Sequence, residues 1–124
     1  MFTLRVKTDF AAAHFLEGYP YECKRLHGHN FVVEVFVKGH NLDKLGMLID
    51  FKVLKSIVRD EISRFDHELL NELPDFKGIN PTSENISRVL FTNIKRRLSN
   101  INHDCELMRV RVWENENGYV DYEE

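Results

Sequence analysis

Residues 31–37 read Phe-Val-Val-Glu-Val-Phe-Val, which is the strongest β-strand pattern in the 124-residue chain. β-branched and aromatic residues favour an extended backbone, and successive side chains of a strand alternate between two faces. The odd-numbered positions, all Phe or Val, therefore share one face, while Val32 and Phe36 flank Glu34 on the other. Both faces are largely apolar, which predicts a sheet that is covered on both sides.

The segment directly before this strand, residues 23–29, reads Cys-Lys-Arg-Leu-His-Gly-His. If it is extended, His27 and His29 project from the same face, and one metal ion can take a nitrogen from each. Gly28 has no Cβ, so it leaves room for close approach by a metal ion or another chain. A histidine pair of this kind predicts a metal site only if further ligands join it.

A third histidine, His14, lies late in the first predicted strand. This strand covers residues 2–15, and three alanines come directly before His14. This strand would pair as a hairpin with the strand that follows His29, and the pairing would bring His14 beside His27 and His29. Three imidazoles are the ligand set of an open catalytic zinc site. On the alternative interpretation His14 is only a polar strand residue, and the alanines mark a tight contact between sheets.

Two amphipathic helices and a second hairpin follow. Asp50 is the expected N-cap of the first helix, and Thr82 or Ser83 is the expected N-cap of the second, where Glu84 favours the positive end of the helix dipole. Residues 107–114 alternate again, and residues 119–122 return as a short strand after an Asn-Gly turn. The order ββααββ predicts an α+β domain with a four-stranded antiparallel sheet and both helices on one face.

Composition sets limits on the class of protein. A chain of this length, with 43% hydrophobic and 30% charged residues, is expected to form one globular domain. The net charge of −3 argues against nucleic acid as a partner. No apolar run approaches the ~20 residues of a membrane span, and no signal peptide opens the chain, so no membrane partner is expected. Cys23 and Cys105 form no CxxC motif; one disulfide stays open as an alternative to a cytoplasmic protein with free thiols.

Three further groups could carry chemistry. Cys23, next to metal-bound histidines, would have its thiol pKa lowered from the usual ~8.5 and supply thiolate, or it could be a fourth zinc ligand or a buried structural thiol. Asp66 and His67 could act as an orienting acid and a base. Glu114 is a carboxylate on an apolar strand face, where it needs a cation or a ligand donor, unless the strand end is frayed and exposed.

The combination of motifs is more specific than any one of them. In sequence order the chain carries His14, Cys23-x-x-x-His27-Gly28-His29, Ile49-Asp50-Phe51, Asp66-His67, Pro81-Thr82-Ser83-Glu84-Asn85 and Glu114. Over nearly its whole length it resembles the 6-pyruvoyl-tetrahydropterin synthase family. The three-residue gap between Cys23 and His27 is similar to the bacterial and archaeal 6-carboxytetrahydropterin synthases, whereas the animal pyruvoyl enzymes have a longer gap. The tail, residues 115–124, carries no motif of this set.

The resemblance implies a single tunnelling-fold (T-fold) domain over residues 1–124 and a homohexamer, built as a dimer of trimers with active sites between subunits. It implies three sets of functional residues: zinc ligands His14, His27 and His29; catalytic residues Cys23, Asp66 and His67; and substrate-binding residues Glu114, Thr82 and Ser83. In this arrangement Cys23 is the general base, and Glu114 binds the pterin by two parallel hydrogen bonds.

The implied reaction is zinc-dependent conversion of 7,8-dihydroneopterin triphosphate to 6-carboxy-5,6,7,8-tetrahydropterin, acetaldehyde and triphosphate. It belongs to the biosynthesis of queuosine and other 7-deazapurines. Two alternatives lie within the family, a 6-pyruvoyl-tetrahydropterin synthase and a side-chain-cleaving enzyme of the folate branch. An alternative from another class is a non-catalytic zinc-binding or pterin-binding module.

Overall fold

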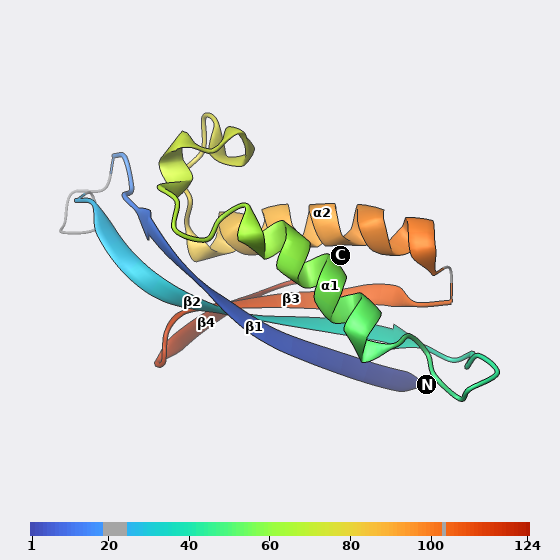
Figure 1. The fold of residues 1–124 in the computed structure, drawn as a ribbon. Coiled ribbons are helices and arrows are strands. Elements are labelled where there is room, and N and C mark those ends of the chain that lie inside the picture. Colours follow the sequence, from blue (N-terminus) through green and yellow to red (C-terminus); the bar gives the residue numbers. More distant parts are fainter. Residues whose placement is uncertain (19–24, 103) are drawn as a thin grey trace.

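The computed structural model describes residues 1–18, 25–102 and 104–124 (Figure 1). In chain order the elements of these ranges are β1 (Phe2–His14), β2 (His27–Gly39), α1 (Phe51–Ser63), η2 (Leu70–Glu72), η3 (Pro74–Phe76), α2 (Ser83–Ile101), β3 (Glu106–Asn115) and β4 (Gly118–Tyr122). The elements η2 and η3 are short 3-10 turns in the connection between the helices. The order ββααββ predicted from the sequence is confirmed.

The strands form one antiparallel sheet in the order β1-β2-β3-β4, and both helices cover the same face of it (Figure 1). The long β1–β2 hairpin is in register from Phe2 opposite Gly39 to His14 opposite His27. The predicted fold class and the predicted hairpin pairing are therefore both correct. Within the described ranges, no helix is long and apolar enough to span a membrane.

Side-chain caps define where the helices begin. The Asp50 carboxylate accepts the backbone N–H of Lys52 at 2.8 Å at the start of α1, as predicted. The Thr82 hydroxyl accepts the backbone N–H of Asn85 at 3.1 Å, so Thr82 caps α2 and Ser83 is its first helical residue. These bonds satisfy N–H groups that have no partner within the helix.

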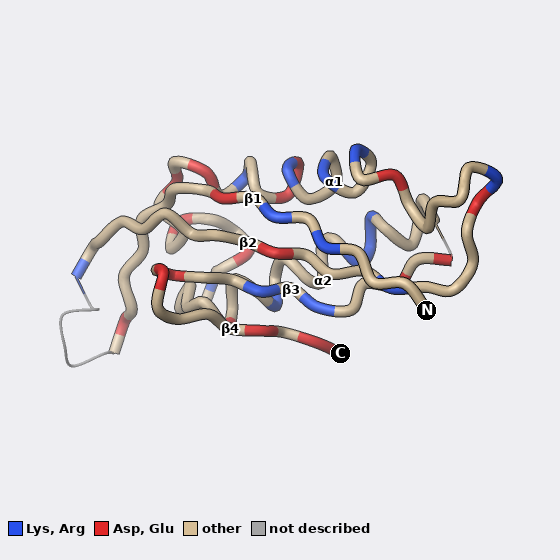
Figure 2. Tube along the Cα trace, turned by 90° about the horizontal axis from the view of Figure 1, so that it is seen from below, with Lys and Arg blue, Asp and Glu red and all other residues tan. Residues whose placement is uncertain are grey.

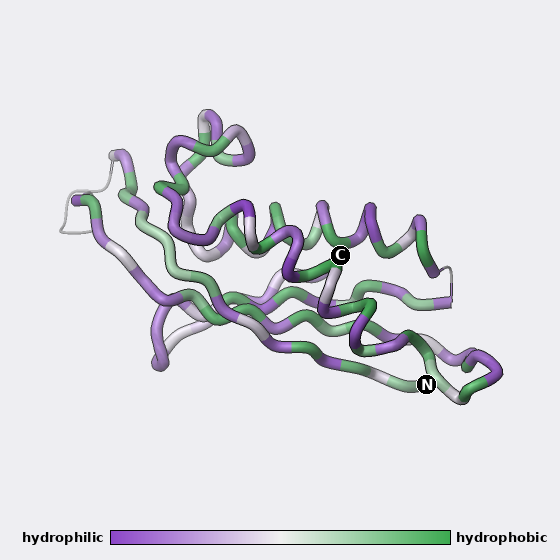
Figure 3. The backbone as a smooth tube through the Cα atoms, in the orientation of Figure 1, coloured by the Kyte–Doolittle hydropathy of each residue, from purple (hydrophilic) through white to green (hydrophobic). Residues whose placement is uncertain are grey.

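The core lies between the helices and the covered face of the sheet. The odd-numbered residues of 31–37 are completely buried there, together with Leu54 of α1 and Leu90 of α2. Figure 3 shows how hydrophobic and hydrophilic residues alternate along the strands. The alternation leaves one side of each strand to pack against the helices.

A bulge in β3 breaks the strict alternation that the sequence of residues 107–114 predicts. Strict alternation assigns Met108 to the same face as Val110 and Val112. In the structure Leu107 is buried instead and Met108 is only half-buried, because the pairing with β2 shifts by one residue between Phe36 and Val37. An extra residue in one strand of a pair changes which side chains face the core.

The face of the sheet without helices is covered in part by its own long side chains. Glu34 is almost completely buried there, where it accepts hydrogen bonds from Arg5 at 2.7 Å and from the Trp113 indole at 2.7 Å. The guanidinium groups of Arg109 and Arg111 lie over the Phe36 ring. Figure 2 shows this face, with basic and acidic residues intermixed along the strands.

Candidate metal centre

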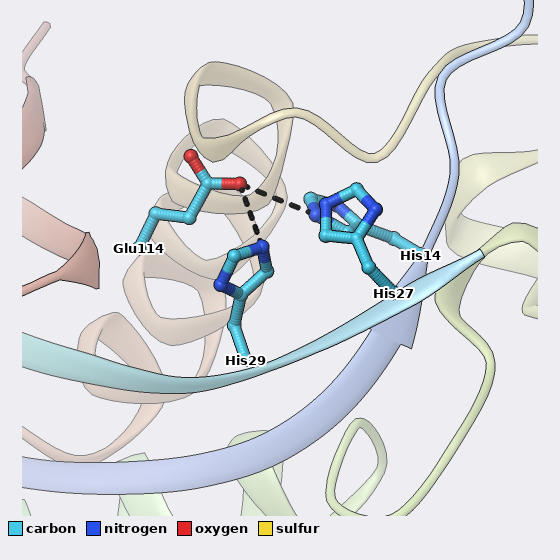
Figure 4. A group of neighbouring side chains, drawn as sticks. All are labelled: His14, His27, His29 and Glu114. Carbon is cyan, nitrogen blue, oxygen red and sulfur yellow. Dashed lines mark ion pairs between the residues drawn. The ribbon is translucent and has the colours of Figure 1, made fainter. Parts of the chain in front are cut away.

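Three imidazoles come together at one end of the β1–β2 hairpin (Figure 4). His14 lies directly opposite His27, and their ring centroids are 4.5 Å apart. His29, two residues further along β2, has its ring centroid 5.2 Å from that of His14 and 4.7 Å from that of His27. Opposite residues of an antiparallel pair project from the same face, so the hairpin register produces this cluster.

Backbone carbonyls orient two of these rings. His14 Nδ1 lies 2.8 Å from the Pro81 carbonyl oxygen, and His27 Nδ1 lies 2.7 Å from that of Arg25. A carbonyl oxygen only accepts, so each Nδ1 carries the proton and donates it. The Nε2 atoms of His14 and His27 are left with their lone pairs free, which is the tautomer that a metal-binding histidine requires.

The Glu114 carboxylate points into the same space (Figure 4). Its Oε1 lies 3.2 Å from Nε2 of His14 and 3.3 Å from Nε2 of His29. Neither contact has hydrogen-bond geometry, so both buried Nε2 atoms have no hydrogen-bond partner among the residues that the structure describes. One ligand atom from each of His14, His27, His29 and Glu114 lies within 4.8 Å of all the others.

These donors fit a metal ion. Buried nitrogen atoms with free lone pairs lose free energy unless a partner binds them, and zinc accepts histidine nitrogen and carboxylate oxygen in a four-coordinate site. The pKa of His29 is lowered from its ordinary value, chiefly because burial disfavours the charged ring, although the Glu114 charge opposes this. A lowered pKa favours the neutral imidazole, which is the form that binds metal.

Asp66 and His67 lie together and dock on the outer edge of β1. The Ala11 N–H donates to the Asp66 carboxylate at 3.0 Å, and the His67 N–H donates to the Ala11 carbonyl at 2.6 Å. The other Asp66 oxygen lies 3.0 Å from His67 Nδ1. The pKa of Asp66 is lowered, first because its carboxylate accepts the Ala11 N–H and also because of its contact with His67. The predicted orienting contact between the two side chains is therefore present.

The His67 side chain is strongly exposed, and its backbone has a positive φ of 62°. His67 and His29 line the same open hollow of about 510 Å³, together with the three alanines of residues 11–13. Small side chains along β1 leave this space open. A second groove, of about 930 Å³, includes His29, Glu114 and Trp113 and extends over Arg5 and Arg111.

The remaining predicted site residues have different surroundings. The Thr82 hydroxyl is occupied by the helix cap, whereas the Ser83 hydroxyl is buried and has no hydrogen-bond partner within residues 1–18, 25–102 and 104–124. Cys23 lies outside the described residues. Sequence reasoning missed the Pro81 carbonyl and the Ala11 backbone, since main-chain groups leave no residue-type signal. Pro81 entered the sequence analysis only as the first residue of the motif at residues 81–85.

A family model described as 6-pyruvoyl tetrahydropterin synthase matches residues 3–124. The chain belongs to this family. It is 40% identical over 116 residues to the putative 6-carboxy-5,6,7,8-tetrahydropterin synthase of Archaeoglobus fulgidus, covering 94% of this chain and 90% of that protein. It is 33% identical to the 6-carboxy-5,6,7,8-tetrahydropterin synthase of Bacillus subtilis, with 98% of this chain and 84% of that protein covered.

The family's solved structures share the fold. The 6-pyruvoyl tetrahydropterin synthase of Caenorhabditis elegans superposes with a TM-score of 0.83 at 25% identity, covering 99% of this chain and 95% of that one. The dihydroneopterin monophosphate aldolase of Pyrococcus furiosus is also a relative. It is 35% identical, with 94% of this chain and 93% of that protein covered. Family members with differently named activities thus resemble this chain to similar degrees.

Proposed function

We propose that this protein is a zinc-dependent 6-carboxytetrahydropterin synthase that acts on 7,8-dihydroneopterin triphosphate and releases acetaldehyde and triphosphate. The observation that carries the proposal is the convergence of the His14, His27 and His29 imidazoles, two of them fixed by carbonyls in the metal-binding tautomer. With Glu114 assigned to the pterin, three imidazoles would leave the fourth metal position open for substrate. The corresponding biological role is in 7-deazapurine (queuosine) biosynthesis.

Two observations favour the carboxy branch. Cys23 precedes His27 by the short spacing of that branch. Relatives named for the carboxy reaction in Archaeoglobus fulgidus and Bacillus subtilis align with nearly the whole chain. The Dictyostelium discoideum relative named 6-pyruvoyl tetrahydrobiopterin synthase is 34% identical, with 82% of this chain covered, and it supports the pyruvoyl reaction as the second candidate.

We assign roles that the chemistry requires. Zinc, when bound, would polarise the hydroxylated side chain of the substrate as a Lewis acid. Cys23 would remove a carbon-bound proton as thiolate. His67 would move protons on the opposite side of the substrate, and Asp66, anchored to β1 through Ala11, would hold its ring in one orientation.

Glu114 would hold the pterin ring. An ionised carboxylate accepts two parallel hydrogen bonds from the amino group and the ring N–H of a pterin, and this orients a planar ligand. Because the Glu114 carboxylate lies next to the imidazoles, a pterin bound to it would have its side chain over the metal position. Ser83, whose buried hydroxyl has no partner in the described part of the chain, and the neighbouring Thr82 would line the same pocket.

We further propose a homohexamer assembled from two trimers. Both outer strands support this proposal. Within the described ranges, β1 has backbone partners on its outer edge only near Ala11 and Ala13, and β4 forms the other edge of the sheet. Unpaired edges favour pairing with another chain. The exposed ring of His67 is consistent with a site that a neighbouring subunit completes.

The reaction is tested by incubating the zinc-loaded protein with dihydroneopterin triphosphate and identifying products by mass spectrometry. We expect 6-carboxytetrahydropterin together with acetaldehyde. A pyruvoyl product without acetaldehyde would move the protein to the pyruvoyl branch. Binding of the pterin without any turnover would contradict an enzymatic function.

A further inference from the structure

Two asparagines hold the chain immediately after His14. The Phe15 N–H donates to Asn71 Oδ1 at 3.0 Å, and Asn71 Nδ2 donates to the Phe15 carbonyl at 2.9 Å. Two residues further on, Glu17 makes the same pair of bonds with the side chain of Asn80, at 2.9 and 3.0 Å. A side-chain amide has one acceptor and two donor hydrogens, so it can pair with a peptide group as a neighbouring strand would.

The two amides extend a row of contacts along the outer edge of β1. Ala13 donates its N–H to the Glu68 carbonyl at 3.0 Å, and His14 donates from its ring to the Pro81 carbonyl at 2.8 Å. The β1–β2 ladder ends at His14, and the asparagines continue the outer-edge contacts of Ala11 and Ala13 on alternate residues. Asn80 is also joined directly to Pro81, so it lies next to the carbonyl that orients the His14 ring.

One side of this segment borders a hollow of about 450 Å³, lined among others by Phe15, Glu17, Asn71 and Asn80. Side chains that surround a hollow have fewer contacts than those in a filled core. On this side, the hydrogen bonds from Asn71 and Asn80 are therefore specific contacts that fix the backbone at Phe15 and Glu17.

We infer that Asn71 and Asn80 are positioning residues for the metal site. They hold the backbone after His14 against the segment 71–81, so that the His14 ring stays between the Pro81 carbonyl and the metal position. The inference rests on the proposed function, because it takes His14 as a metal ligand. Its readout is metal affinity, which does not depend on what the protein does with a pterin.

The substitutions Asn71→Asp and Asn80→Asp test this with little change in size. In each variant one carboxylate oxygen can still accept the backbone N–H. The other carboxylate oxygen has no proton to donate, yet it faces the backbone carbonyl that the amide bonded. The matched control is Asn102→Asp. Asn102 also accepts a backbone N–H, from Asp104 at 2.8 Å, and donates to a backbone carbonyl, that of Leu48, at 2.9 Å.

The control lies far from the metal site. Asn102 follows the last residue of the 19-residue helix α2, and Pro81 precedes its first turn. A helix of this length spans about 28 Å. Asn102→Asp therefore makes the same change of side chain and hydrogen bonding, but at the opposite end of helix α2 from Pro81.

Zinc affinity is measured on the full-length protein by competition with a chromophoric chelator, and unfolding is followed by urea titration. We expect Asn71→Asp and Asn80→Asp to weaken zinc binding by about 10- to 100-fold, the loss typical of outer-shell partners of a metal ligand. Asn102→Asp should lose comparable stability but keep its zinc affinity. Asn71→Gln, which retains the amide, should restore most of the affinity; Asn80→Asp serves alone if Asn71→Asp does not fold.

Unchanged zinc affinity in both site variants would overturn the inference and reduce the asparagines to a structural role. An equal loss in Asn102→Asp would overturn it as well, because the effect would then be global. A wild-type protein that binds zinc but gives no pterin product would contradict the proposed reaction alone.

Discussion

The role of Glu114 can be decided by the substitution Glu114→Gln. Its carboxylate contacts two imidazoles, at 3.2 and 3.3 Å, and we propose that it binds the pterin. A hydrogen bond to a charged group contributes about 1.5–3 kcal/mol, and the amide replaces one of two acceptors with a donor. In the variant one hydrogen bond is lost, and the amide N–H of the new glutamine faces an N–H of the pterin. This should cost about 3 kcal/mol, or about 100-fold in affinity for the pterin.

The assay is a fluorescence titration of zinc-loaded protein with a pterin that cannot react, combined with metal analysis of the same samples. Glu114→Gln should keep its zinc and lose pterin affinity. Glu106→Gln, which removes an exposed carboxylate at the other end of β3, is the matched control and should lose neither. Loss of zinc from Glu114→Gln with pterin affinity unchanged would make Glu114 a metal ligand and refute the assigned role.

Three further predictions concern the fold and its titrating groups. Phe10→Ala should lower the unfolding free energy by about 3–5 kcal/mol in urea denaturation, because Phe10 is 1% exposed, whereas Phe51→Ala, at 52% exposure, should change it little. The pKa of Asp66 is lowered, chiefly by a hydrogen bond from a β1 backbone N–H. Its contribution to the free energy of unfolding is therefore present at neutral pH and lost as the pH falls through that lowered pKa. Asp66→Asn should flatten the fall in stability between about pH 5 and pH 2. Burial raises the pKa of Cys105 to about 11, so iodoacetamide at about pH 8 should spare Cys105 in the native protein and alkylate Cys23, with peptide mass mapping as the readout.

Much of the candidate metal site could be predicted from the sequence because the grouping of its side chains depends on strand register. Alternation places His27 and His29 on one face, and hairpin pairing brings His14 opposite His27. The adjacent pair Asp66 and His67 was equally visible, since the two residues are neighbours in the chain. These features follow from local periodicity and from the pairing of consecutive strands.

Contacts between distant segments could not be predicted. The docking of Asp66 on Ala11 joins residues 55 positions apart through a backbone N–H, which has no signature in the sequence. The approach of Glu114 to the histidines depends on how β3 pairs with β2, and Glu114 itself lies in an irregularity of the β3–β4 pairing, between Trp113 and Asn115. Sequence patterns give the faces of strands but not such irregularities.

The zinc content of the purified protein and its histidine variants tests the central claim most directly. We expect about one zinc per chain in the wild type and none in His27→Ala or His29→Ala. His40→Ala, at an exposed position after β2, is the control and should retain full occupancy. Full zinc occupancy in the His29→Ala protein would contradict the assignment of the three-histidine site.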